Sequence, residues 1–214
     1  MSECARHYCL HYVDAGRKDI RLGNVQGSGA GHFSLSFDDA HRSVLEHAAP
    51  VLKELGVVAT LFVPTAYVGT SAEFLSWDEL RALRDLGWTL GSHSVSHVRL
   101  GQRIYDEDEA ALHELTTAYM RLVISMATRF RHYGLPMSDL VSEAAHASRL
   151  ADECERSRDA MHRELGAQNG APLTFAYPFG EATELARAAV EGAGYAAAFT
   201  VASTLDWDGD MLAI

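Results

Sequence analysis

Four side chains in two short motifs are suited to binding a metal ion. Asp38 and Asp39 are adjacent and follow an apolar run, and His93 and His97 are four residues apart. Two imidazoles and one carboxylate form a three-ligand set that leaves a coordination position for water, as catalytic zinc requires. A second carboxylate beside that water is placed to act as a general base. Together these residues predict a metal-assisted hydrolytic centre.

Each motif on its own also has a purely structural interpretation. The chain has eleven histidines, so a pair four residues apart arises readily by chance, and His7 and His11 form another such pair. Aspartate is a favoured N-cap, so the aspartate pair is also consistent with the start of a helix. A cap needs only one carboxylate, however. When two carboxylates are held close together, their repulsion raises the pKa of one of them unless a cation neutralises the pair.

Strand-like and helix-like segments alternate along the chain, which indicates an α/β fold with a largely parallel sheet. In such sheets functional groups gather at the carboxyl ends of the strands. Both metal-ligand motifs and the segment "YPFG" lie at expected strand ends. The segments expected to hold strands are 7–13, 32–37, 57–64, 88–94, 173–180 and 195–201.

Three amphipathic segments are predicted to be helices. The first spans residues 40–55 and ends at Gly56, a favoured residue just beyond a helix. The second starts at Ser76 with Glu79 three residues later, which is a capping-box pattern, and the third follows residue 180. One helical face of 40–55 is expected to be apolar and buried, and it carries Val44, Ala48, Val51, Leu52 and Leu55.

The long stretch from about 104 to 166 is predicted to form two helices that break at residues 133–136. We interpret about 101–150 as a helical-hairpin insertion in a single domain that spans residues 1–214. The hairpin either covers apolar surface, forms a homo-oligomer interface or narrows the site as a lid. Its apolar residues recur at helical spacing and must be buried against something, namely Leu115, Tyr119, Leu122 and Met126.

Composition restricts the classes of partner. The net charge of −11 argues against a nucleic-acid or anionic-membrane partner, because polyanions are bound by clustered Lys and Arg. The chain has no membrane-length apolar run and no basic leader followed by an apolar segment. The three cysteines show no paired spacing, which is typical of a reducing compartment. We therefore expect a cytoplasmic protein.

Three segments in this order resemble the polysaccharide deacetylases, the NodB-homology carbohydrate esterases of family 4. The first, residues 36–69, opens with "SFDD"; the second, 74–100, carries "HSVSH"; and the third, 174–201, opens with "TFAYPFG". The segment "DECERSRDAMHRELG" also fits the family. The resemblance implies a distorted (β/α) barrel and a metal-dependent N-deacetylase.

The resemblance also implies a role for each site residue. Asp39, His93 and His97 are expected to bind a divalent metal, with Zn²⁺ as the expected ion. Asp38 is expected to be the catalytic base. The backbone N–H of Phe179, at the family's usual tyrosine position, is expected to stabilise the oxyanion. The residues expected to contact substrate are Tyr177, Pro178, Phe179 and Trp207.

The chain departs from the family in two places. Ala176 stands where many members have an arginine that orients the catalytic aspartate, and the segment "LDWDGDMLAI" lacks the family's late histidine, its general acid. A group of relatives begins with a strand similar to "YCLHYVD", so His11 is a candidate for the acid. The alternative interpretation of His11 is an exposed strand histidine.

The predicted function is therefore hydrolysis of the acetamide of an N-acetylated sugar or sugar-containing small molecule, with release of acetate. Two alternatives stay open at this point. One is hydrolysis of another linear amide, such as a formamide. The other is a non-catalytic binding or scaffold protein on the same fold.

Overall fold

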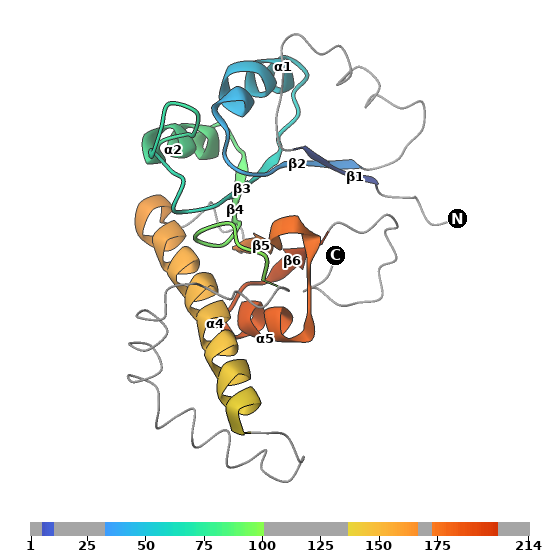
Figure 1. The fold of residues 1–214 in the computed structure, drawn as a ribbon. Coiled ribbons are helices and arrows are strands. Elements are labelled where there is room, and N and C mark those ends of the chain that lie inside the picture. The colour runs from blue at the N-terminus through green and yellow to red at the C-terminus, as the bar shows by residue number, and fades with distance from the viewer. Residues whose placement is uncertain (1–5, 11–32, 101–136, 167–172, 201–214) are drawn as a thin grey trace, which may run out of the picture.

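The centre of the molecule is a sheet of six parallel strands that are neighbours in chain order (Figure 1). The computed structural model describes residues 6–10, 33–100, 137–166 and 173–200. Every expected strand segment overlaps one of the strands, which confirms the α/β prediction. The strands are β1 (Arg6–Leu10), β2 (Phe33–Phe37), β3 (Thr60–Val63), β4 (Thr89–Ser92), β5 (Thr174–Ala176) and β6 (Ala197–Phe199).

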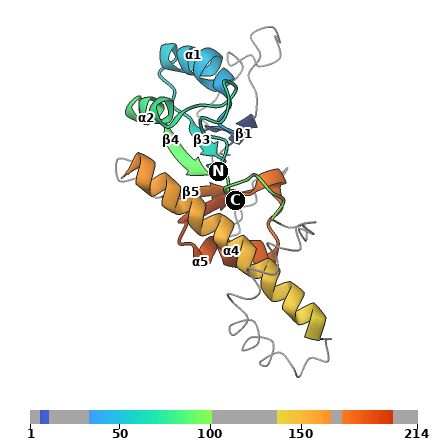
Figure 2. The same ribbon diagram turned by 60° about the vertical axis from the view of Figure 1, so that its left-hand side comes forward.

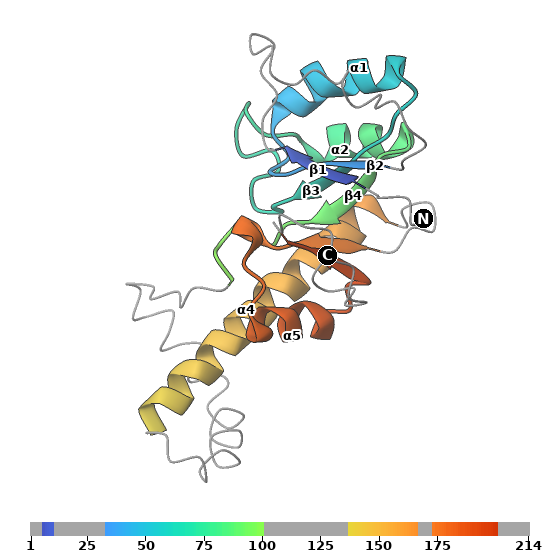
Figure 3. The same cartoon turned by 90° about the vertical axis from the view of Figure 1, so that its right-hand side faces the viewer.

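Helices cover the outside of this sheet in two groups (Figures 2 and 3). One group lies over the first strands and the other over the last ones, with α4 in contact with α2, β4 and α5. The π-helical turn η2 (Val44–Ala48) runs directly into α1. The α-helices are α1 (Ala49–Glu54), α2 (Trp77–Asp85), α4 (Met137–Leu165) and α5 (Glu184–Gly192).

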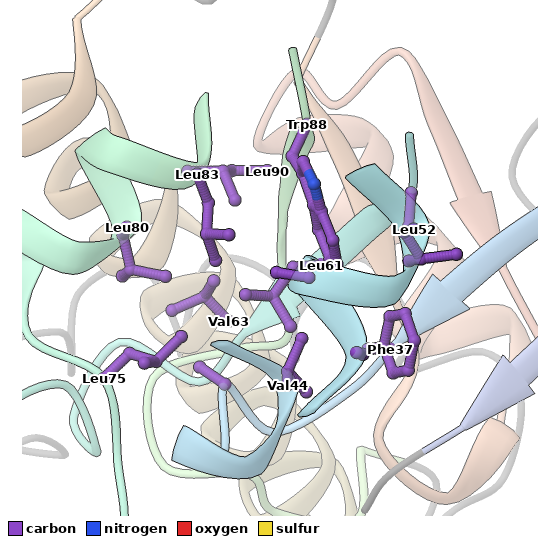
Figure 4. Close-up of a cluster of buried hydrophobic side chains, with 14 of the residues drawn as sticks. Phe37, Val44, Leu52, Leu61, Val63, Leu75, Leu80, Leu83, Trp88 and Leu90 are labelled. Atoms are coloured by element: carbon purple, nitrogen blue, oxygen red, sulfur yellow. The ribbon is translucent and has the colours of Figure 1, made fainter. Parts of the chain in front are cut away.

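The strand register explains how one face of the sheet meets the helices. Phe37 pairs with Leu61 and Leu61 with Leu90, so these three side chains share a face. All three belong to the apolar core under α1 and α2 that Figure 4 shows. Further along, Phe175 and Ala198 are paired and belong to the second core, under α4 and α5. The helices therefore cover the convex face of a curled half-barrel, and the alternate residues face its interior.

The first predicted helix differs from expectation at its centre. The chain makes a π-helical turn before Pro50, which has no N–H to donate back into the helix. The wider turn rotates the residues that follow it relative to a regular helix. Val44 and Leu52 are therefore buried, whereas Val51 and Leu55 are each 40% exposed, and the prediction that both lie on the buried face was wrong.

The capping box of α2 is present as predicted. The Ser76 hydroxyl accepts from the Glu79 N–H, and the Glu79 carboxylate accepts from the Ser76 N–H. Glu79 also pairs with Arg42, whose guanidinium lowers the pKa of the Glu79 carboxyl to about 2. Because Arg42 lies close after the aspartate pair, this ion pair ties the loop behind β2 to the start of α2.

Helix α4 confirms the second helix expected after the break at residues 133–136. Residues 101–136, which include most of the predicted insertion and its four apolar positions, lie outside the described residues. The buried stripe of α4 has helical spacing and consists of His146, Leu150, Cys154, Ser157, Met161 and Leu165. None of the described helices is long and apolar enough to span a membrane.

The interior of the half-barrel leaves no room for a side chain at Gly91. A Cβ at this position of β4 would lie 2.4 Å from Cδ1 of Phe62 and 2.9 Å from Oγ1 of Thr174. The Phe62 ring is itself held on its other side, since it packs on Phe199 with the ring centroids 5.3 Å apart. Glycine at this position lets the aromatic ring lie against the strand backbone.

We predict that Gly91→Ala destabilises the protein by about 1–3 kcal/mol, because the added methyl group overpacks a filled interior. Thermal or urea unfolding measures this change. Gly192→Ala is the matched control, since Gly192 is helical and a Cβ there meets nothing within 4 Å. That control is expected to be neutral or stabilising by up to about 1 kcal/mol. Equal unfolding midpoints for Gly91→Ala and the wild type would contradict the packing argument.

Candidate metal centre

The two aspartates lie at the carboxyl end of β2, where the backbone turns sharply. Asp39 and Ala40 have φ values of 69° and 50°, in the left-handed region that non-glycine residues rarely adopt. The segment 73–75 holds this turn through two backbone hydrogen bonds. The Ala40 carbonyl accepts from the Leu75 N–H, and the Arg42 N–H donates to the Glu73 carbonyl. The helical segment begins only after His41, so neither aspartate is its N-cap.

His93 follows β4 directly and is almost fully buried, with 1% of its surface exposed. Its backbone N–H donates to the Val63 carbonyl, which continues the pairing of β4 with β3. Its side-chain Nδ1 lies 2.8 Å from the Ala176 carbonyl oxygen. A carbonyl only accepts, so Nδ1 carries the proton in this contact and Nε2 keeps its lone pair. The hydrogen bond therefore selects the tautomer that a metal ligand needs.

His97 reaches the same place from the other end of the loop. It has a φ of 56°, and its backbone N–H donates to the Ser94 hydroxyl over 3.0 Å. The rings of His93 and His97 have centroids 4.7 Å apart. The loop thus returns upon itself and brings two imidazoles, four residues apart in the sequence, to one point.

The three predicted ligand residues converge. Asp39 Oδ1 lies 3.3 Å from His97 Nε2 and 3.9 Å from His93 Nε2, and the three ligand atoms all lie within 4.8 Å of one another. Around a tetrahedral zinc ion with bonds of about 2.0–2.1 Å, ligand atoms lie about 3.3 Å apart. The separations and the donor types therefore fit a divalent cation with one carboxylate and two imidazole ligands.

Asp38 lies beside this group. Its Oδ2 is 3.9 Å from His93 Nε2, and only 5% of the residue is exposed. Both carboxylates therefore lie 3.9 Å from His93 Nε2, and Asp38 is the more buried of the two. A cation bound by Asp39 would also offset the charge of Asp38, which makes the pair of acids compatible with burial.

The third motif contributes a tight turn next to His97. Phe179, in the 3₁₀ turn Pro178–Gly180, has a φ of 59° and is 51% exposed. Its ring centroid is 4.8 Å from that of His97, and the guanidinium of Arg99 lies over the ring at 4.1 Å. Tyr177 and Pro178, by contrast, are buried, and Tyr177 packs edge-on against Phe175. Of these three predicted contact residues, only Phe179 is exposed.

Some of the residues that shape this site were not predicted from the sequence. Glu153 and Ser157, one turn apart on α4, hydrogen-bond to the loop between the histidines. Two sequence signals point to them: both lie in the segment "DECERSRDAMHRELG" that fits the family, and Ser157 is a polar residue within the apolar stripe of its helix. His11 and Trp207, the other two predicted site residues, lie outside the described residues.

Comparison with known proteins supports the family resemblance over most of the chain. The family model for polysaccharide deacetylases matches residues 26–198. A curated protein, the RNA polymerase sigma-C factor of Myxococcus xanthus, is 49% identical over 45 residues, which is 21% of this chain and 15% of that protein. So short a match concerns one segment only.

Two solved structures share the fold. The deacetylase domain of BpsB from Bordetella bronchiseptica is 15% identical with a TM-score of 0.68, and the match covers 98% of this chain and 93% of that one. The deacetylase PplD from Streptococcus pyogenes, in complex with acetate, is 17% identical with a TM-score of 0.56. That match covers 89% of this chain and 65% of PplD. With its half-barrel and the extended family match, this chain belongs to the polysaccharide deacetylase family.

Proposed function

We propose that this chain is a metal-dependent deacetylase that hydrolyses the acetamide of an N-acetylated sugar or sugar-containing small molecule. The observation that carries the proposal is the convergence of Asp39, His93 and His97 on one point, with Asp38 beside them. Membership of the polysaccharide deacetylase family supports the same chemistry. The acetate named with the PplD structure is consistent with it.

Asp39, His93 and His97 are the residues that would hold the metal, and Zn²⁺ suits a set of two nitrogens and one oxygen. Bound there, a divalent cation would polarise the amide carbonyl and lower the pKa of a coordinated water towards about 7. The protein must present each ligand atom in the protonation state that leaves its lone pair available to the metal. The hydrogen bond from His93 to the Ala176 carbonyl does this for Nε2 of His93.

Asp38 is our candidate for the general base. It is buried next to the ligand group, so its carboxylate can accept a proton from the attacking water without competition from bulk solvent. Many family members use an arginine to orient this aspartate, whereas Ala176 occupies that position here. In this chain the tight turn at Asp39 and Ala40 directly follows Asp38 and helps to set its backbone position.

The backbone N–H of Phe179 is our candidate for stabilising the oxygen that becomes negative during attack. The left-handed φ of Phe179 sets the direction of this peptide group. One such preorganised donor is typically worth about 3–4 kcal/mol of the barrier. The exposed ring of the same residue offers an apolar surface beside His97 for the sugar or the acetyl methyl group.

We predict that the three ligand residues and Asp38 have separable effects. His97→Ala and Asp39→Asn are expected to lose bound zinc and activity together, whereas Asp38→Asn keeps the metal. The turnover of Asp38→Asn is expected to fall by about a hundredfold to ten-thousandfold, because only proton transfer is lost. Elemental analysis and acetate release measure the two properties. His162→Ala, at an exposed histidine of α4, is the control and should change neither. Full metal content in His97→Ala would contradict the site.

A second prediction concerns the product. With metal bound, the protein should release acetate and free amine in equal amounts from N-acetylated sugars or sugar conjugates. Matched N-formyl compounds discriminate the acyl group, and preferential formate release would favour the formamide alternative. Absence of any acyl release from a metal-loaded protein across such a panel would favour a non-catalytic binding protein.

We further propose that His11, in a segment similar to the first strand of a group of relatives, supplies the proton for the leaving amine. His11→Gln is then expected to lower turnover without changing the metal content. His7→Gln, at the other histidine of the same N-terminal pair, is the matched control and is expected to behave like the wild type. Unaltered turnover in His11→Gln would remove this role.

A further inference from the structure

The loop between the two histidine ligands has an unusual backbone. Ser94 and His97 both have positive φ, at 64° and 56°, and such conformations persist only when surrounding contacts fix them. Within this loop the N–H groups of Val95 and Ser96 both donate to an acceptor outside the loop, which helps to hold the strained turn.

Glu153 of α4 provides that acceptor. Its Oε2 accepts from the Val95 N–H over 2.9 Å and from the Ser96 N–H over 3.1 Å. Its Oε1 accepts from the Ser96 hydroxyl over 2.8 Å. Hydrogen bonds to a carboxylate are stronger than those between neutral groups. Among the described residues, the Glu153 carboxylate makes these three hydrogen bonds and no ion pair.

Ser157, one turn further along α4, holds the start of the same loop. Its hydroxyl donates to the Ser94 carbonyl over 3.0 Å and lies 2.6 Å from the hydroxyl of Ser92, the last residue of β4. Both serine side chains are fully buried. One face of α4 thus contacts the loop at its entry through Ser157 and at its centre through Glu153.

We propose that Glu153 is a positioning residue for the metal centre. Its carboxylate fixes the Val95–Ser96 turn and thereby aims the His97 imidazole at the point shared with His93 and Asp39. This inference rests on the proposed metal-dependent function. Glu153 is not one of the three candidate ligands, and it acts through the backbone that carries His97.

The test is metal affinity, measured by competition with a chromophoric chelator, together with the visible spectrum of the Co²⁺-loaded protein. Glu153→Ala is expected to bind Zn²⁺ about tenfold or more weakly, as is usual when a ligand's supporting contact is lost. Its Co²⁺ spectrum is expected to change. Glu153→Gln should recover part of the affinity, because its amide oxygen can accept from the loop N–H groups while its NH₂ donates to the Ser96 hydroxyl.

Glu155→Ala is the matched control. This residue lies on the same helix, carries the same charge and is exposed, so its affinity and spectrum should match the wild type. All measurements are made well below the unfolding temperature of each metal-free protein. A general loss of stability then leaves the affinity unchanged, and only a displaced ligand lowers it.

Wild-type affinity and spectrum in Glu153→Ala would overturn the positioning role, and so would an equal loss in Glu155→Ala. If Glu153→Ala does not fold, Glu153→Gln decides: measurably weaker binding supports the role, and wild-type binding overturns it. A wild-type protein that binds no metal would instead overturn the proposed function itself, and Glu153 would have no ligand to position. The two failures are therefore distinguishable.

Discussion

The short separation between one carboxylate and two imidazole nitrogens is the constraint that the rest of the site depends on. Asp39 and His97 approach to 3.3 Å, and a second acid, Asp38, is buried beside them. Gathering two acids in a buried space is costly, since each loses solvation and repels the other. A bound cation would relieve this repulsion, so the pair of acids is consistent with the proposed metal site.

This arrangement concentrates backbone strain at the carboxyl edge of the sheet. Among the described residues, the non-glycine positions with positive φ are all in the three loops that form the site: Asp39, Ala40, Ser94, His97 and Phe179. Such conformations cost of order 1–3 kcal/mol each. Two apolar cores on the convex face of the half-barrel, together with hydrogen bonds from α4 and the 73–75 segment, keep the loops in place.

The strand segments and the convergence of Asp39, His93 and His97 could be predicted from the sequence because each leaves a local pattern. Apolar runs ending in Asp38 and His93 locate strand ends, and parallel strands bring those ends to one edge. Other features leave no such pattern. The π-helical turn before Pro50 exposes Val51 and Leu55, although their spacing fits a buried face. The tautomer of His93 depends on a carbonyl 83 residues away, and Glu153 meets its loop from 58 residues away.

Those long separations have a consequence for how the protein folds. The segment from β2 to His97 is contiguous and brings together all three candidate ligand residues, but contacts that orient its histidines come from α4 and β5. Closing such distant contacts costs chain entropy and tends to occur late. For the proposed metal site, we therefore expect a correctly oriented ligand set only after the C-terminal half has docked.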